Sequence, residues 1–172
     1  MSELTCAQEC QIVAKTLSEF TSAIPKQVLS LAMGIAVCNG STGVALVRLP
    51  SQEWSAPCAI LLQSTTSISP GQATVLLFMT EQCLYSLVGR TGMILGKTHS
   101  FMPGPMYSGS VNAEVLAYVR YNGGFTPEQL IRDHMTGTLI NCNNYIIIMI
   151  YGCITIQILG SNTRLVRARR YG

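Results

Sequence analysis

Charge is scarce in this sequence. Charged residues make up 11% of the 172 residues, against about 25% in an average soluble domain. Disordered segments combine high net charge with low hydrophobicity, and coiled coils need many charged surface positions, so both classes are excluded. Hydrophobic residues reach 48%. This balance indicates one folded domain whose surface contacts a partner, a membrane or a second copy of itself.

Residues that usually carry catalysis are also few. The chain has two histidines, His99 and His134, and a single aspartate, Asp133. No spacing joins a histidine, a carboxylate and a nucleophile in a known motif, and no cluster has metal-ligand spacing. We therefore expect a protein that is not an enzyme and that holds no metal or cofactor. An enzyme using the Asp133-His134 pair is a much weaker alternative.

A phosphate-binding loop is only partly matched. Gly96-Lys97-Thr98 follows an apolar run, as the end of such a loop does, but Thr91 stands where its first glycine should be. A helix should follow and present its N-terminus to the phosphates. The sequence HSFMPGPM follows instead, with two prolines. The bulky, apolar Met93-Ile94-Leu95 favour a strand instead.

No C-x-x-C pair occurs among the seven cysteines, and the acidic N-terminus MSELTCAQECQ lacks the basic and apolar regions of a signal peptide. We therefore expect a cytoplasmic protein with reduced, mostly buried thiols. The cysteines are Cys6, Cys10, Cys38, Cys58, Cys83, Cys142 and Cys153.

No apolar run is long enough to cross a membrane as a helix. The longest extends from Tyr145 to Leu159, is interrupted by Gly152 and Gln157, and falls short of the ~20 residues required. Its isoleucines and threonines favour strands. It is predicted to form two core strands broken near Tyr151.

Helical periodicity is confined to the first part of the chain. Cys6, Cys10, Val13, Leu17 and Phe20 recur on one helical face. The Cys6 and Cys10 pair has the spacing of two metal ligands, but core positions on an apolar stripe explain it better, since no further ligand lies nearby.

A second, short helix is expected to begin after Pro25, with Val28, Leu29 and Ala32 facing inward. Short helices are also expected from Thr80, as N-cap, to Leu87 and after Pro127.

From Gly34 onward the pattern favours strands. Short apolar runs are separated by glycine, proline and serine: GIAVC, GVALVRL, APCAILL, ATVLLFM and EVLAYVRY. The sequence thus predicts an α+β fold in which N-terminal helices pack on a strand-rich, largely antiparallel sheet or barrel-like body. We expect one domain over 1–172, with a helical part at 1–33, the strand-rich body at 34–160 and a basic tail at 161–172.

Acidic residues are absent after Asp133, whereas four arginines follow: Arg164, Arg167, Arg169 and Arg170. Residues 134–172 therefore carry +4 and the rest of the chain carries −1, within a total of +3. The tail is either an electrostatic handle for an anionic surface or a solvated terminus. A net charge this small does not by itself indicate nucleic acid.

Several segments together resemble the SYLF domain. The most specific is Trp54-Ser55-Ala56-Pro57-Cys58-Ala59-Ile60, which matches that family's Trp-Ser-Ala-Pro-Ser-Ala-Ile signature at all but one position. The weaker matches occur in the family's order: Ile24-Pro25, Gly43-Val44, Arg48-Leu49, Gly104-Pro105, Ala113-Glu114, Tyr118, Arg120, Gly123 and Phe125. The chain departs from the family in lacking a glycine-rich run after Ile60 and in carrying Thr126-Pro127 after Phe125.

The resemblance implies non-catalytic, peripheral binding of acidic phospholipids or phosphoinositides at cytoplasmic membranes, as in endocytic or actin-linked trafficking. The alternative is a module that binds actin or an endocytic coat partner, with lipid binding lost. Neither involves nucleic acid. The candidate lipid-binding residues are the cations Lys15, Lys26, Arg48, Arg90, Arg120, Arg164, Arg167, Arg169 and Arg170. For each of these cations the alternative is a solvated charge, and for Arg48 also a structural hydrogen-bond donor. Trp54 is either an interfacial anchor or, as we expect, a core residue.

Overall fold

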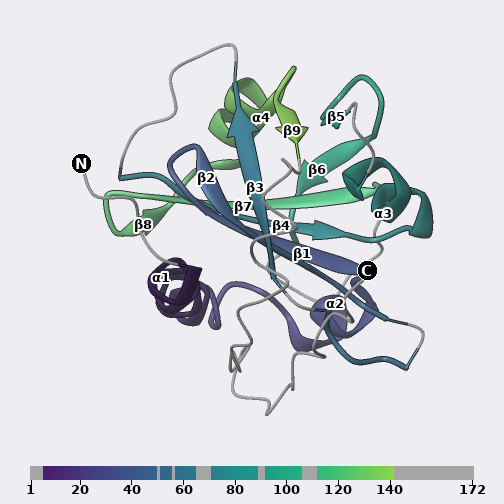
Figure 1. The fold of residues 1–172 in the computed structure, drawn as a ribbon. Helices are drawn as coiled ribbons and strands as arrows, with labels where there is room; N and C mark the ends of the chain where they lie inside the picture. The colour runs from purple at the N-terminus through teal and green to yellow at the C-terminus, as the bar shows by residue number, and fades with distance from the viewer. Residues whose placement is uncertain are drawn as a thin grey trace.

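The computed structural model describes residues 6–49, 51–55, 57–64, 71–88, 92–105 and 112–141 (Figure 1). Within these ranges the helices are α1 (Cys6–Glu19), α2 (Lys26–Leu31), α3 (Glu81–Val88) and α4 (Glu128–Met135). The strands are β1 (Gly34–Asn39), β2 (Thr42–Val47), β3 (Cys58–Gln63), β4 (Ala73–Phe78), β5 (Met93–Ile94), β6 (Phe101–Pro103), β7 (Val115–Tyr121), β8 (Gly124–Phe125) and β9 (Leu139–Asn141).

The nine strands form one curled sheet in the order β5-β9-β3-β2-β1-β4-β7-β6, and β8 pairs with β7. Every described strand pair is antiparallel except β6–β7. The curled sheet makes a half-barrel with the helices around it (Figure 1). The predicted α+β class, with N-terminal helices on a largely antiparallel body, is confirmed.

Helices cover both faces of the sheet, so its central strands are apolar on both sides. Ile35 and Val37 of β1 pack with α1 and α2. The alternate residues Ala36 and Cys38 face the opposite core, which also contains residues of α3 and α4. All six side chains of β4 are buried. A strand buried on both faces reads as a continuous apolar run, which is why ATVLLF shows no alternation.

The predicted stripe of α1 is the face that the sheet buries. Cys10, Val13, Leu17 and Phe20 are at most 5% exposed, with Phe20 just beyond the helix end. Thr16 joins α1 to the sheet, because the Asn39 side-chain amide donates a 2.9 Å hydrogen bond to its hydroxyl.

The short helices begin where the sequence predicted. Pro25 precedes α2, and Val28 and Ala32 are buried. Thr80 caps α3, since its hydroxyl accepts the N–H of Cys83 at 3.4 Å. Pro127 precedes α4.

Gly43 allows β2 to lie close against β1. An added Cβ would lie 2.0 Å from the Val37 carbonyl oxygen and 2.7 Å from Cys38 Cα. Both contacts are to backbone, so only glycine fits at this position of the sheet.

Three predictions fall outside the described residues: the isoleucine-rich strands of 145–159, the basic tail of 161–172 and the candidate residue Arg90. In the parts of the chain that the structure describes, no helix is long and apolar enough to cross a membrane.

Candidate functional site

The structure gives Arg48 a structural position at the end of β2. Its Nε donates to the Ala32 carbonyl at 3.0 Å, and its terminal nitrogens donate to the carbonyls of Gln52 (3.3 Å) and Leu29 (3.4 Å). The guanidinium carbon lies 4.2 Å from the centroid of the Trp54 ring, and partial burial lowers the Arg48 pKa. Trp54 itself is only 3% exposed. The arginine therefore ties α2 to the Trp54 turn, as the structural interpretation of the sequence anticipated.

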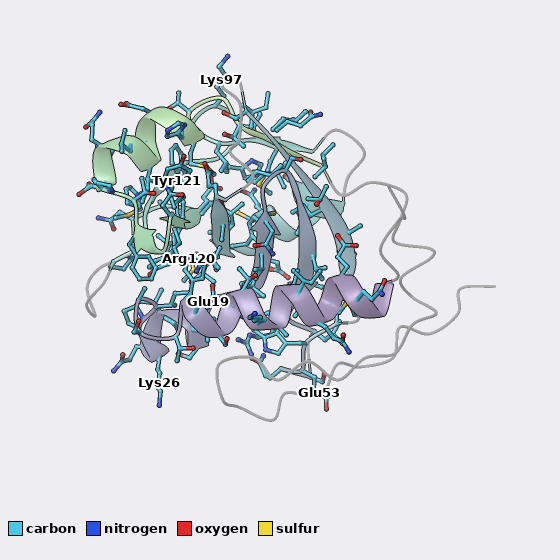
Figure 2. The ribbon with its side chains drawn as sticks, turned by 90° about the vertical axis from the view of Figure 1, so that its left-hand side faces the viewer. Glu19, Lys26, Glu53, Lys97, Arg120 and Tyr121 are labelled. Carbon is cyan, nitrogen blue, oxygen red and sulfur yellow. The ribbon has the colours of Figure 1, made fainter. Side chains whose placement is uncertain are left out.

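Arg120 is held between an acid and an aromatic ring. Its terminal nitrogen lies 2.5 Å from a Glu19 carboxylate oxygen, and its guanidinium carbon lies 6.0 Å from the Phe20 ring centroid. Figure 2 shows Arg120 on β7 directly beside Glu19 at the end of α1. Because a carboxylate already balances this cation, it is a poor candidate for binding an anionic headgroup.

The remaining described candidates are exposed lysines. Lys15 lies on the outer side of α1, and Lys26 opens α2. Figure 2 places Lys26 at the same end of the molecule as Glu19 and Arg120. The structure therefore does not join the four described candidates into one headgroup pocket: two are engaged within the fold, and two are surface charges on different helices. The other candidates, Arg90 and the four tail arginines, are not among the described residues.

Large apolar side chains gather instead beside β8 and α4. Tyr121, Phe125 and Leu130 are 46%, 41% and 46% exposed. All three line one groove of about 450 Å³, and we call them the apolar rim. The Phe125 ring makes an edge-to-face contact with the buried Phe20 ring, at 5.5 Å between ring centroids. Sequence reasoning noted Phe125 only as a matching position and missed the other two.

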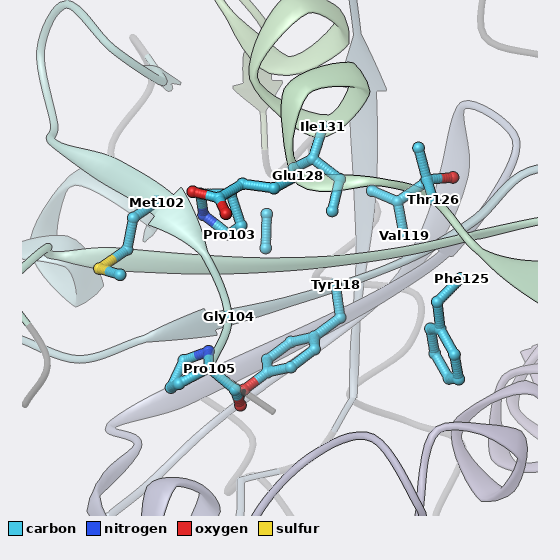
Figure 3. A pocket seen from close by; sticks show the side chains of 11 residues that line it. Met102, Pro103, Gly104, Pro105, Tyr118, Val119, Phe125, Thr126, Glu128 and Ile131 are labelled. Carbon is cyan, nitrogen blue, oxygen red and sulfur yellow. Dashed lines mark hydrogen bonds between the residues drawn. The ribbon is translucent and has the colours of Figure 1, made fainter. Parts of the chain in front are cut away.

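A second groove, of about 320 Å³, adjoins the first and shares Phe125 with it (Figure 3). Tyr118 lies on its floor, where the hydroxyl donates to the Pro105 carbonyl at 2.8 Å. Gly104 lies against the face of the Tyr118 ring, so closely that a Cβ there would lie 2.0 Å from a ring carbon. Burial raises the Tyr118 pKa to about 12. Two segments of the resemblance that are distant in sequence, Gly104-Pro105 and Tyr118, are thus in contact.

The charges around the grooves come mainly from α4. Glu128 and Arg132 form an exposed ion pair at 2.7 Å, and Gln129 donates a 3.0 Å hydrogen bond to Asp133. The backbone carbonyl of His134 accepts a 2.9 Å hydrogen bond from the Ser64 hydroxyl. Two carboxylates and one guanidinium leave this helix without excess positive charge, so any attraction to anions must come from other parts of the chain.

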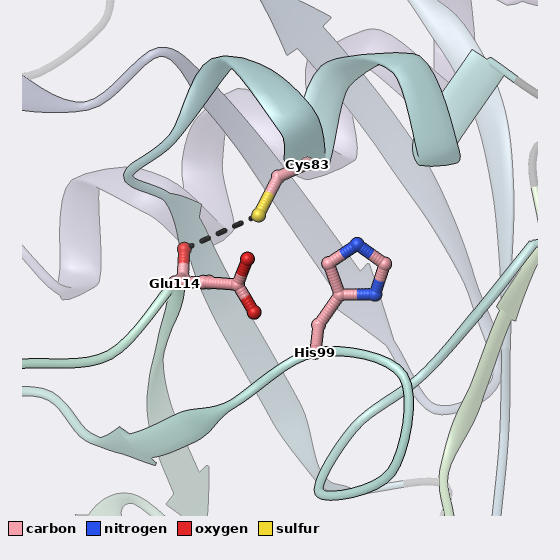
Figure 4. A group of neighbouring side chains, drawn as sticks. All are labelled: Cys83, His99 and Glu114. Atoms are coloured by element: carbon pink, nitrogen blue, oxygen red, sulfur yellow. Dashed lines mark hydrogen bonds between the residues drawn. The ribbon is translucent and has the colours of Figure 1, made fainter.

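Cys83, His99 and Glu114 meet beside the start of β7 (Figure 4), with their ligand atoms all within 4.8 Å of one another. Sequence reasoning missed this cluster because its members lie on three separate segments with no motif spacing. By contrast, Gly96-Lys97-Thr98 forms a tight turn, with the Gly96 N–H donating to the His99 carbonyl at 2.8 Å. That N–H is therefore not directed at a phosphate.

Cys38, on β1, is a further buried thiol. Burial, and secondarily the nearby negative charge of Glu9, raise its pKa to about 12. Burial also raises the Glu9 pKa. A thiol that stays protonated is a poor nucleophile, so Cys38 serves as a small core residue.

Comparison with known proteins adds no family assignment. A scan against protein-family models finds no match to the chain, and a search of curated proteins likewise finds none. The resemblance to the SYLF domain therefore remains a prediction, based on the residues quoted above and on the contacts that some of them make.

Proposed function

We propose that this protein is a SYLF-like module that binds acidic phospholipids or phosphoinositides peripherally, at cytoplasmic membranes of endocytic or actin-linked trafficking, without catalysis. In this proposal the apolar rim enters the membrane interface, and basic side chains elsewhere in the chain hold the protein to the anionic surface.

The observation that carries the proposal is the joint exposure of Tyr121, Phe125 and Leu130 along one groove. Aromatic and leucine side chains are the ones that interfacial segments bury at the headgroup level. Their position on a short hairpin and an adjacent helix lets all three reach a surface together.

The energies of the two contributions are similar. Fully burying a side chain of this size yields about 1.5–3 kcal/mol, so three half-exposed side chains yield about 3 kcal/mol. Four tail arginines near an anionic leaflet add about 4 kcal/mol. Together they correspond to a dissociation constant of roughly 10 μM, whereas the arginines alone reach only the millimolar range.

Liposome flotation of the full chain tests the proposal. Vesicles with and without a few per cent of phosphoinositide, each at two salt concentrations, separate headgroup preference from general charge attraction. We expect flotation that requires anionic lipid and weakens with salt. The double variant Tyr121→Ser/Leu130→Ser removes about 2 kcal/mol of insertion and should bind about 30-fold more weakly at either salt concentration.

Ile12→Ser is the matched control. Ile12 is 43% exposed, like the rim residues, but lies on α1 outside both grooves. Its loss should leave flotation unchanged. Equal weakening by the control and the rim variant would refute the assignment to the rim, and salt-independent binding would refute the role of the arginines.

The alternative function, binding to actin or a coat protein, predicts a different outcome. Absence of flotation under every condition would overturn the lipid proposal. Co-sedimentation with actin filaments, if weakened by the same rim variant, would then support a protein-binding role for the groove.

A further inference from the structure

Three potential metal ligands converge at one end of the sheet, away from the apolar rim. Cys83 comes from the first turn of α3, His99 from the segment between β5 and β6, and Glu114 from the residue before β7. The sulfur, an imidazole nitrogen and a carboxylate oxygen all lie within 4.8 Å of one another. Figure 4 shows the three side chains pointing into a common space.

The backbone fixes the three positions independently of any ligand. The Glu114 carbonyl accepts the Met79 N–H at 2.8 Å, which ties the start of β7 to the segment before α3. The Ser100 carbonyl accepts the Val115 N–H at 3.1 Å, which holds the segment that follows His99 beside β7. The three donors therefore belong to one connected part of the sheet.

Each potential ligand also has a partner that orients it. The Ser100 N–H donates to Glu114 Oε2 at 2.9 Å. The Thr98 hydroxyl lies 2.9 Å from His99 Nδ1, and the Thr80 hydroxyl donates to the Cys83 sulfur at 3.2 Å. Such outer contacts set the tautomer and direction of ligands in metal sites. With its proton on Nδ1, bonded to Thr98, the imidazole keeps the Nε2 lone pair for a metal.

We propose that Cys83, His99 and Glu114 form a zinc-binding site that leaves one coordination position for water. A thiolate, an imidazole and a carboxylate are the three donor types that Zn²⁺ takes in proteins. Three protein ligands with a free fourth position are the arrangement of an open zinc site, as distinct from a closed structural one.

The charge and geometry of the site are consistent with a divalent ion. Cys83 is buried, with 0% of its surface exposed. On binding, the metal replaces the thiol proton, which passes to solvent. The resulting thiolate and the Glu114 carboxylate together balance the 2+ charge. Tetrahedral zinc separates neighbouring donors by about 3.5 Å, so side-chain rotation needs to bring atoms now within 4.8 Å of one another closer by at most about 1.3 Å.

Titration of the reduced full chain with Co²⁺, followed by competition with Zn²⁺, tests the site. We expect one equivalent of cobalt to give a near-ultraviolet thiolate-to-metal absorption band that zinc abolishes. Cys83→Ser should lose the band. Glu114→Gln keeps an acceptor for the Ser100 N–H, so it preserves the fold, and it should bind zinc at least 10–100-fold more weakly. His99→Gln should also bind zinc at least 10–100-fold more weakly.

Matched controls separate this cluster from other thiols and imidazoles. Cys58→Ser and His134→Gln change the same residue types elsewhere in the sheet and on α4, and both should retain the cobalt band. Thr98→Val removes the contact to His99 together with the bonds of its hydroxyl to the Ile94 N–H (2.8 Å) and carbonyl (3.2 Å), and should weaken zinc binding by about 10–100-fold. Circular dichroism without metal checks that each variant is folded.

Two results would overturn the proposal. One is a wild-type chain that binds neither Co²⁺ nor Zn²⁺ at micromolar concentration. The other is a folded Cys83→Ser variant with an undiminished band. Neither result bears on lipid binding, because the cluster is remote from the apolar rim.

Discussion

Replacing Gly43 with alanine should destabilise the fold strongly, because the added methyl group has no space between β2 and β1. The new Cβ would lie 2.0 Å from the Val37 carbonyl oxygen and 2.8 Å from Cys38 Sγ. The strand cannot move away, because β2 is hydrogen-bonded to β1 on one side and β3 on the other. Overpacking a core costs about 1–3 kcal/mol when side chains can adjust. Because the contact here is to backbone in a doubly paired strand, we expect a loss of about 3 kcal/mol or more.

Urea unfolding of Gly43→Ala and of Gly124→Ala, followed by circular dichroism, measures this cost. Gly124 is the matched control, since an added Cβ there has no atom within 4 Å. With a denaturant dependence of roughly 2 kcal/mol per molar urea, the Gly43→Ala midpoint should fall by about 1.5 M. The control should stay within about 0.3 M of wild type. Equal midpoints for the two variants would show that β2 does not lie this close to β1 in the folded protein.

Two further predictions concern residues whose roles the structure reassigns. Arg48→Lys keeps the charge but loses the planar donor set and the stacking on Trp54. The substitution should lower the free energy of unfolding, measured in urea, by about 1–3 kcal/mol and should leave liposome flotation unchanged. If Arg48 bound a lipid headgroup, flotation would weaken instead and the free energy of unfolding would stay the same. Tyr118 has a pKa raised to about 12, so the unfolded chain ionises first. The stability it contributes is complete below pH 10 and is lost as pH rises from 10 towards 12, by about 2–3 kcal/mol. Unfolding midpoints measured against pH for wild type and Tyr118→Phe should diverge in this window. Parallel curves would assign the loss to other groups such as Cys38.

The local elements of this fold could be predicted from the sequence because their causes are local. The stripe from Cys10 to Phe20 has helical periodicity, since only one face of α1 touches the sheet. Pro25 and Pro127 mark helix starts because proline fits a first turn. Strand order has no such local cause. β3 pairs with β9, and β4 with β7, so the order depends on contacts between distant segments.

The roles of the candidate site residues likewise depend on partners that are distant in the sequence. A sequence presents Arg48 and Arg120 simply as cations, but their partners lie elsewhere in the chain: carbonyls of α2 for the first, and Glu19 for the second. The apolar rim could not be recognised beforehand, because Tyr121 and Leu130 have the composition of core residues. Only the curl of the sheet beside α4 decides that they are exposed. Cys83, His99 and Glu114 likewise become neighbours only through the β-sheet.

The pairing of β3 with β9 has a consequence for synthesis of the chain. β3 ends at Gln63, and the strand that covers its outer edge begins only at Leu139. At roughly 5–20 residues per second, the nascent chain carries this apolar edge unpaired for about 4–15 s. In the described residues β9 pairs with Leu61–Gln63, and β3 as a whole reads Cys58-Ala-Ile-Leu-Leu-Gln63, with no charge to discourage pairing with another chain. Folding during synthesis therefore requires that the edge of β3 does not pair with another chain before β9 is made. A chain truncated before Leu139 leaves this edge permanently unpaired.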